Sequence, residues 1–91
     1  METRGDRMKE ETIDLLMEKA DESINKALVY IEFGTKHENK TMLLNAHYNL
    51  ARFHAFLDII GEIDMNTMCS IGEQTEKDRD KILKAIDVLY Q

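Results

Sequence analysis

The chain has no proline, no tryptophan, one cysteine and four glycines among its 91 residues. Without proline, no position forces a helix to break or removes a backbone hydrogen-bond donor from it. A single cysteine, Cys69, excludes an internal disulfide and therefore a disulfide-stapled secreted fold. No run approaches the roughly 20 apolar residues that a membrane-spanning helix needs, and the charged first residues do not resemble a signal peptide. We therefore expect a cytoplasmic protein without a membrane span.

Charge excludes another class of partner. Acidic residues outnumber basic residues by 18 to 12, and the formal net charge is −6. This sign repels the phosphate backbone of nucleic acids, and the basic residues do not gather into a patch that would offset the repulsion. The sequence therefore predicts no direct binding to nucleic acid.

Apolar residues recur at helical spacing in the first two thirds of the chain. The first series contains Ile13, Met17, Ala20, Ile24, Ala27 and Ile31. The second contains Leu43, Ala46, Leu50, Phe53, Leu57 and Ile60. Intervals of three and four residues are typical of a helix with one buried side. Gly34 and Gly61 follow these series, where a left-handed glycine commonly ends a helix.

Polar residues indicate where the later helices begin. Thr35 and Glu38 have the spacing of a capping box, which predicts a second helix from about residue 36. The third segment has two competing starts, Asp64 and a second capping-box sequence at residues 70–73. It forms either one helix over about 65–90 or a short turn followed by a helix from about residue 71. Because Asp78 interrupts its apolar series, we expect this segment to be the least stable.

These signals predict an all-α fold in one domain, 1–91, with helices over about 6–33, 36–60 and 65–90. A tight turn between the first two helices favours an antiparallel hairpin, which the third helix completes as a bundle. A chain of this size buries only about 60% of its unfolded surface on folding. We therefore expect a homo-oligomer, a dimer, to complete the burial of apolar surface.

The second predicted helix carries further apolar residues on a different arc, since successive residues turn by about 100°. Together with a neighbouring arginine, they form the predicted self-association or partner-binding surface: Leu44, Tyr48, Ala51, Arg52, Ala55 and Ile59. Three alternatives exist for this arc. The third helix covers it within the chain, a second copy covers it, or a different protein docks on it.

The first predicted helix has an acidic side, with Glu11, Asp14, Glu18 and Asp21. Such a side is either plainly solvated or a docking face for a basic protein. A carboxylate array of this kind also suggests a Mg²⁺-dependent hydrolase. That chemistry needs carboxylates from a facing helix, and the second helix offers none before Asp58.

His47, His54 and Asp58 are the other candidates for chemistry, as a metal or proton-transfer site. The two histidines are about 10 Å apart along a helix, too far for one ion to bridge without further ligands. We therefore interpret them as histidines at the edge of the core, and Cys69 as a small buried apolar residue. The sequence predicts no catalytic residue, no metal site and no cofactor.

The predicted function is that of a non-enzymatic, acidic, cytoplasmic regulator or inhibitor of the phage or mobile-element type. It would self-associate through the second helix and bind another protein. The alternative is an oligomer that binds a small ligand between its subunits. In that case Arg52 would pair with an anionic group and Tyr48 would stack on a ring, with His54 beside them.

Overall fold

In the computed structural model, the backbone is described for residues 4–90 and the side chains for residues 7–90. Within this range the chain forms three α-helices and no strand, so the all-α prediction is confirmed. The elements in chain order are α1 (Arg4–Lys36), α2 (Lys40–Ile63), α3 (Met65–Ile86) and a short 3₁₀ helix, η1 (Asp87–Tyr90).

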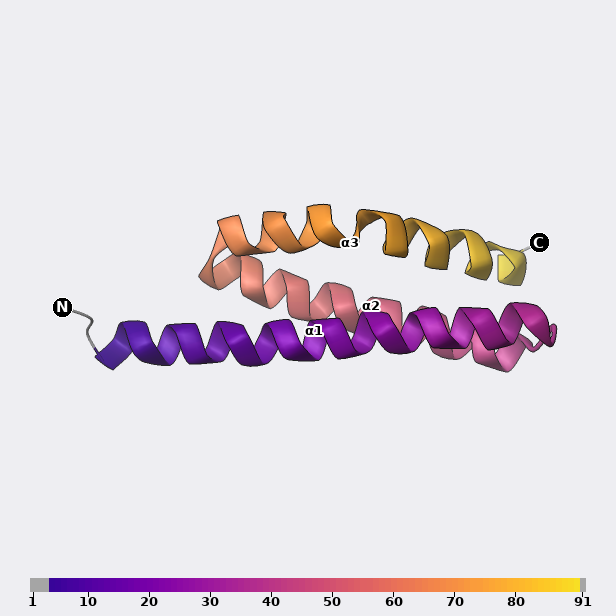
Figure 1. Cartoon of the computed structure of the whole chain (residues 1–91), viewed down its shortest axis with the longest axis horizontal. Helices are drawn as coiled ribbons and strands as arrows, with labels where there is room; N and C mark the ends of the chain where they lie inside the picture. The colour runs from indigo at the N-terminus through magenta and orange to yellow at the C-terminus, as the bar shows by residue number, and fades with distance from the viewer. Residues whose placement is uncertain (1–3, 91) are drawn as a thin grey trace.

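The helices lie side by side in an elongated molecule of 55 × 17 × 16 Å, with α2 antiparallel to both α1 and α3 (Figure 1). The interface between α1 and α2 is the most extensive, and α3 packs more on α2 than on α1. The N-terminal end of α1 extends past the turn between α2 and α3 (Figure 1). Accordingly, α2 is the central helix of the bundle.

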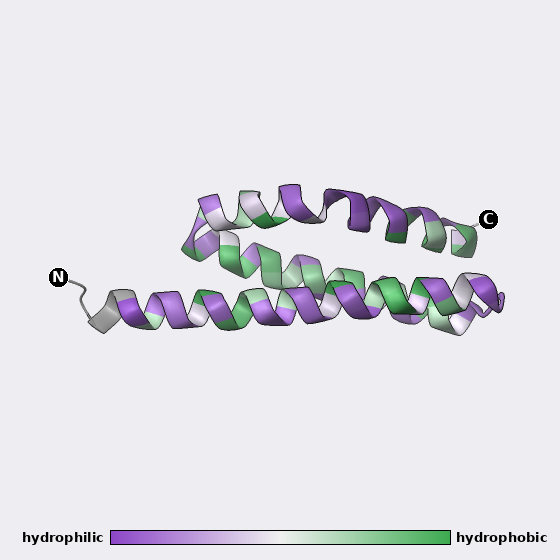
Figure 2. Ribbon diagram, viewed as in Figure 1, coloured by the Kyte–Doolittle hydropathy of each residue, from purple (hydrophilic) through white to green (hydrophobic). Residues whose placement is uncertain are grey.

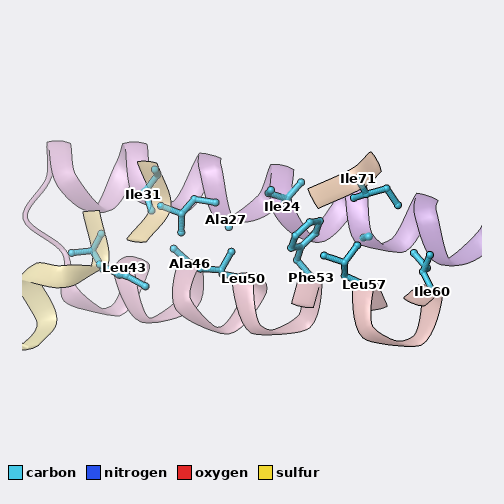
Figure 3. Packing of buried hydrophobic residues seen from close by; sticks show 13 residues of the cluster. Ile24, Ala27, Ile31, Leu43, Ala46, Leu50, Phe53, Leu57, Ile60 and Ile71 are labelled. Carbon is cyan, nitrogen blue, oxygen red and sulfur yellow. The ribbon is translucent and has the colours of Figure 1, made fainter. Parts of the chain in front are cut away.

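The core lies along one side of α2. All six residues of the predicted apolar series in this helix are buried, and Phe53 and Ile60 are fully enclosed. Figure 3 shows Phe53 among apolar residues of α1 and α2. The other helices contribute Ala20, Ile24, Ala27, Ile31, Ile71, Ile82 and Ile86. Burying a large apolar side chain contributes about 1.5–3 kcal/mol, so this cluster dominates the stability of the fold.

The apolar series of α1 is buried only in its C-terminal part. Ala20 and Ile24 are buried, whereas Ile13 is only partly buried and Met17 is 39% exposed. The difference follows from length, because the first turns of α1 extend past the end of α2. Ile13 and Met17 line an open hollow with residues from the start of α3 instead of packing in the core.

Gly34 and Gly61 lie inside helices, so the prediction that they end them is wrong. Neither has a positive φ, and the left-handed residue of the first turn is Glu38, with φ 51°. A Cβ added to Gly34 would lie 2.8 Å from Leu43 Cδ2 and 3.2 Å from the Leu43 backbone nitrogen. Gly34 therefore serves the close approach of α1 to α2.

The helix starts also differ in part from the prediction. Thr35 belongs to α1, so the capping box with Glu38 does not form. Instead, Asn39 caps α2, and its Oδ1 accepts a hydrogen bond from the Met42 N–H at 3.2 Å. At α3, Asp64 Oδ1 accepts from the N–H groups of Asn66 at 3.1 Å and Thr67 at 3.4 Å. These bonds confirm Asp64 as the start of one continuous helix.

The middle of α3 is held by polar contacts rather than by apolar packing. Arg79 folds back along the helix, where Nη2 donates to the Gly72 carbonyl at 2.6 Å and Nε donates to Thr75 Oγ1 at 3.2 Å. Figure 2 shows the same contrast, with α2 hydrophobic along most of its length and α3 hydrophilic through its middle.

Candidate interaction surface

The five apolar residues Leu44, Tyr48, Ala51, Ala55 and Ile59 lie on the side of α2 opposite the core, and we call them the outer face of α2. Leu44 is 57% exposed, Tyr48 61% and Ile59 44%. Both alanines are exposed as well. The alternative in which the third helix covers this arc is therefore wrong, and the outer face lies open in the single chain.

The position of α3 explains why the outer face stays open. It packs on the neighbouring side of α2, around a hollow of about 440 Å³. The hollow is lined by His47, Leu50, Ala51, His54, Leu83, Ile86, Asp87 and Tyr90. Tyr90 Oη and His47 Nδ1 are hydrogen-bonded at 2.9 Å, which holds η1 against α2. Only Ala51, at the margin of the outer face, reaches this hollow.

Arg52 lies at the margin of the outer face away from α3. Its guanidinium carbon is 5.9 Å from the ring centroid of Tyr48 and 5.8 Å from that of Phe56. Cation–π contacts of this kind contribute about 0.5–1 kcal/mol at exposed sites. Arg52 therefore lies against the Tyr48 ring and keeps a positive charge beside the apolar surface.

The structure does not bring His54 to Tyr48 and Arg52. The imidazole of His54 meets the ring of Phe53 edge-on, with centroids 5.5 Å apart, and it lines the hollow beside α3. Burial, and then the positive charge of Arg79, lowers the pKa of His54, while Asp58 opposes the shift. Within one chain, two of the three residues of the predicted ligand site are together and the third is on the other margin of α2.

The predicted acidic docking face lies along α1. Glu11, Asp14, Glu18 and Asp21 are all exposed, and Asp14 also lines the hollow between α1 and the start of α3. Among the described side chains of α1, the ion pairs are those of Glu22 with Lys19 at 3.9 Å and Lys26 at 3.2 Å. The four carboxylates of the acidic face are therefore open to a partner from outside the chain.

Metal chemistry has little support from the side-chain positions. Across residues 7–90, no three His, Cys, Asp or Glu side chains are grouped closely enough to hold a metal ion. Asp14 of the acidic face shares a hollow with Asp64, the residue before α3, but neither belongs to such a group. His47 is engaged with Tyr90 and His54 with Phe53, as expected for histidines at the edge of a core.

Two features differ from the sequence interpretation or were not predicted at all. Cys69 is exposed on α3, so its interpretation as a buried residue is wrong. The contact between His47 and Tyr90 joins residues 43 positions apart, and no local pattern signals it. Helical periodicity indicates which side of a helix is apolar, but not which distant residue lies against it.

The described part of the chain is a three-helix bundle with an open apolar face on its central helix. None of its helices combines the length and the apolarity required to cross a bilayer. No protein-family model, curated protein or solved structure matches this chain.

Proposed function

We propose that the protein is a small, acidic, non-enzymatic regulator or inhibitor that self-associates through the outer face of α2 and binds another protein. The open apolar face on the central helix is the observation that carries the proposal. Exposed apolar patches of this kind mark interaction sites, because leaving them in water is unfavourable and invites association.

The apolar residues of the outer face alone provide too little free energy for a permanent dimer. Leu44, Tyr48 and Ile59 are each about half exposed, so covering one of them contributes about 1 kcal/mol. A symmetric dimer covers these three residues in both copies. The total is on the order of the entropy cost of association, about 4–15 kcal/mol. We therefore expect a dimer that dissociates on dilution rather than a permanent one.

The acidic face of α1 is the proposed docking site for the other protein. Its carboxylates are exposed and lie away from the outer face of α2, so both surfaces are usable at once. Complementary charge speeds association and selects among partners, which suits a regulator that must find one target. We assign the protein to the cytoplasm, where the exposed Cys69 thiol stays reduced, and to the phage or mobile-element type of regulator.

Affinity capture with three immobilised proteins tests this function. They are the wild type, an α1 variant (Glu11→Gln, Asp14→Asn, Glu18→Gln, Asp21→Asn) and the variant Leu44→Glu/Ile59→Glu. The proposal expects a protein that the wild type retains at low salt, that high salt releases and that the α1 variant loses. Enrichment of no protein, or equal retention by the α1 variant, would count against the proposal.

A small-ligand oligomer remains the second candidate, because Arg52 holds a positive charge between two aromatic rings at the margin of the outer face. A second copy on this face would close a pocket around Arg52 and Tyr48, without His54 from the same chain. Ligand-observed NMR with a panel of aromatic carboxylates tests this function. Binding to the wild type that disappears in Arg52→Ala would support it, and binding to neither protein would exclude it for this ligand class.

A further inference from the structure

We infer that two copies of the chain pair their outer faces of α2 in antiparallel orientation, about a twofold axis near Ala51. This inference rests on the proposed self-association and specifies its geometry. The occupant of the outer face is thus a second copy, and each copy supplies the same residues to the other, as a closed twofold dimer requires.

The distribution of side-chain size along the face supports the antiparallel orientation. The two alanines stand at the centre, with Leu44 and Tyr48 on the N-terminal side and Ile59 on the C-terminal side. Small residues at the crossing allow two helix axes to approach closely. An antiparallel rotation about an axis near Ala51 places the Ala51 residues of both copies together. It sets Ala55 of one copy opposite Tyr48 of the other, and Leu44 of one copy opposite Ile59 of the other.

Charge explains how an acidic chain can approach itself on this side. Although the whole chain carries a net charge of −6, α2 has two basic residues, Lys40 and Arg52, and two acidic residues, Asp58 and Glu62. It is therefore neutral by formal count. The two helices carry no net charge into the interface, although the axis near Ala51 brings the two Arg52 side chains to the same margin; the acidic face of α1 stays on the outside of the dimer.

The order of these charges along α2 selects the orientation. Lys40 lies at the N-terminal end, and Asp58 and Glu62 lie near the C-terminal end. An antiparallel pair brings Lys40 of one copy to Glu62 of the other at both ends of the interface, whereas a parallel pair brings like charges together. Neither Lys40 nor Glu62 takes part in an ion pair within residues 7–90, so both are available. The interaction between the two helix dipoles also favours the antiparallel orientation.

Cysteine cross-linking tests the orientation. Two variants are made in a Cys69→Ser background, one with Leu44→Cys and one with Ile59→Cys. Both positions are exposed in the single chain, so the substitutions leave its core intact. Under mild oxidation the antiparallel dimer predicts that a mixture of the two variants forms the mixed disulfide far more readily than either variant alone. A control with Glu73→Cys, on the exposed surface of α3, stays uncross-linked.

The other outcomes overturn different parts of the account. Rapid cross-linking of each variant with itself would show a parallel pair and leave the proposed self-association standing. A dimer without cross-links at either position would place the interface elsewhere. A wild-type protein that is monomeric by light scattering at every concentration would overturn the self-association itself.

A charge exchange provides an independent check. Lys40→Glu alone and Glu62→Lys alone each place like charges at both ends of the antiparallel interface. We expect either variant to dimerise about 2- to 30-fold more weakly than the wild type. The double variant restores opposite charges and recovers the wild-type dissociation constant. Double-variant binding no tighter than that of the single variants would contradict the antiparallel register.

Discussion

The two sides of α2 are built from similar residues, but one side is buried and the other is exposed. The inner side, with Ala46, Phe53 and Ile60, is enclosed by α1 and α3. The outer side, with Leu44, Tyr48 and Ile59, has large apolar residues of the same kind and no covering helix in the chain. An apolar pattern thus identifies residues that should leave water, while the arrangement of neighbouring helices decides which of them do so within one chain.

The largest change in the free energy of unfolding is expected when an aromatic ring is removed from the inner side of α2, and removal of a ring from the outer side is the comparison. Phe53→Ala leaves a cavity in the core and should lower the free energy of unfolding by about 3–5 kcal/mol. Tyr48→Ala removes a ring from the outer face together with its contact to Arg52, and should change it by no more than about 1 kcal/mol in the monomer. Urea denaturation at a fixed low protein concentration measures both. Equal losses at the two positions would contradict the distinction between the sides.

A smaller effect is expected where α1 touches the inner side. In Gly34→Ala the new methyl group meets both the side chain and the backbone of Leu43, and we expect a loss of about 1–3 kcal/mol. Gly61→Ala is the comparison variant. Its methyl group meets Met68 Sδ, the end of a flexible side chain that can turn aside. Thermal unfolding that ranks Gly61→Ala below Gly34→Ala in stability would contradict this interpretation of the two contacts.

Gly72 is expected to respond in the opposite direction. It lies within α3, and a Cβ there would have Arg79 Nη2 as a neighbour at 4.0 Å, an ordinary contact distance. Gly72→Ala should therefore stabilise the protein by about 0.5–1 kcal/mol through helix propensity. The same urea titration measures the gain. A loss would show that the hydrogen bond from Arg79 to the Gly72 carbonyl needs the glycine.

The smallest effect is a pH dependence at the margin between the two sides of α2. Burial, and then the charge of Arg79, lowers the pKa of His54 in the folded state. Between the ordinary histidine pKa and this lower value, the unfolded chain therefore binds more protons than the folded chain. Stability is therefore complete above about pH 6.5 and declines as the pH falls towards the pKa of folded His54. In His54→Gln, urea denaturation at several pH values should show a smaller decline. An unchanged decline would show that titratable groups other than His54 cause the pH dependence of stability.

The inner side of α2 was predictable from the sequence, because six apolar residues at three- and four-residue intervals define one side of a helix without reference to neighbours. The structural roles of the glycines were not predictable from the sequence. Glycine serves both left-handed helix ends and close helix contacts, and only the approach of Leu43 to Gly34 identifies the second role. The composition of the outer face was likewise predictable. Its exposure was not, since no local signal encodes the side of α2 on which α3 packs.

Light scattering over a dilution series tests whether the outer face of α2 binds a second copy. The proteins compared are the wild type, Leu44→Glu/Ile59→Glu, and a control, Val29→Glu/Met65→Glu, whose exposed substitutions lie outside the outer face of α2. A dimer through the outer face predicts that the wild type and the control have twice the chain mass at high concentration and dissociate on dilution. It predicts that Leu44→Glu/Ile59→Glu is a monomer with unchanged helix content by circular dichroism. A wild-type monomer at every concentration, or a Leu44→Glu/Ile59→Glu variant that still dimerises, would contradict the claim that the outer face of α2 binds a second copy.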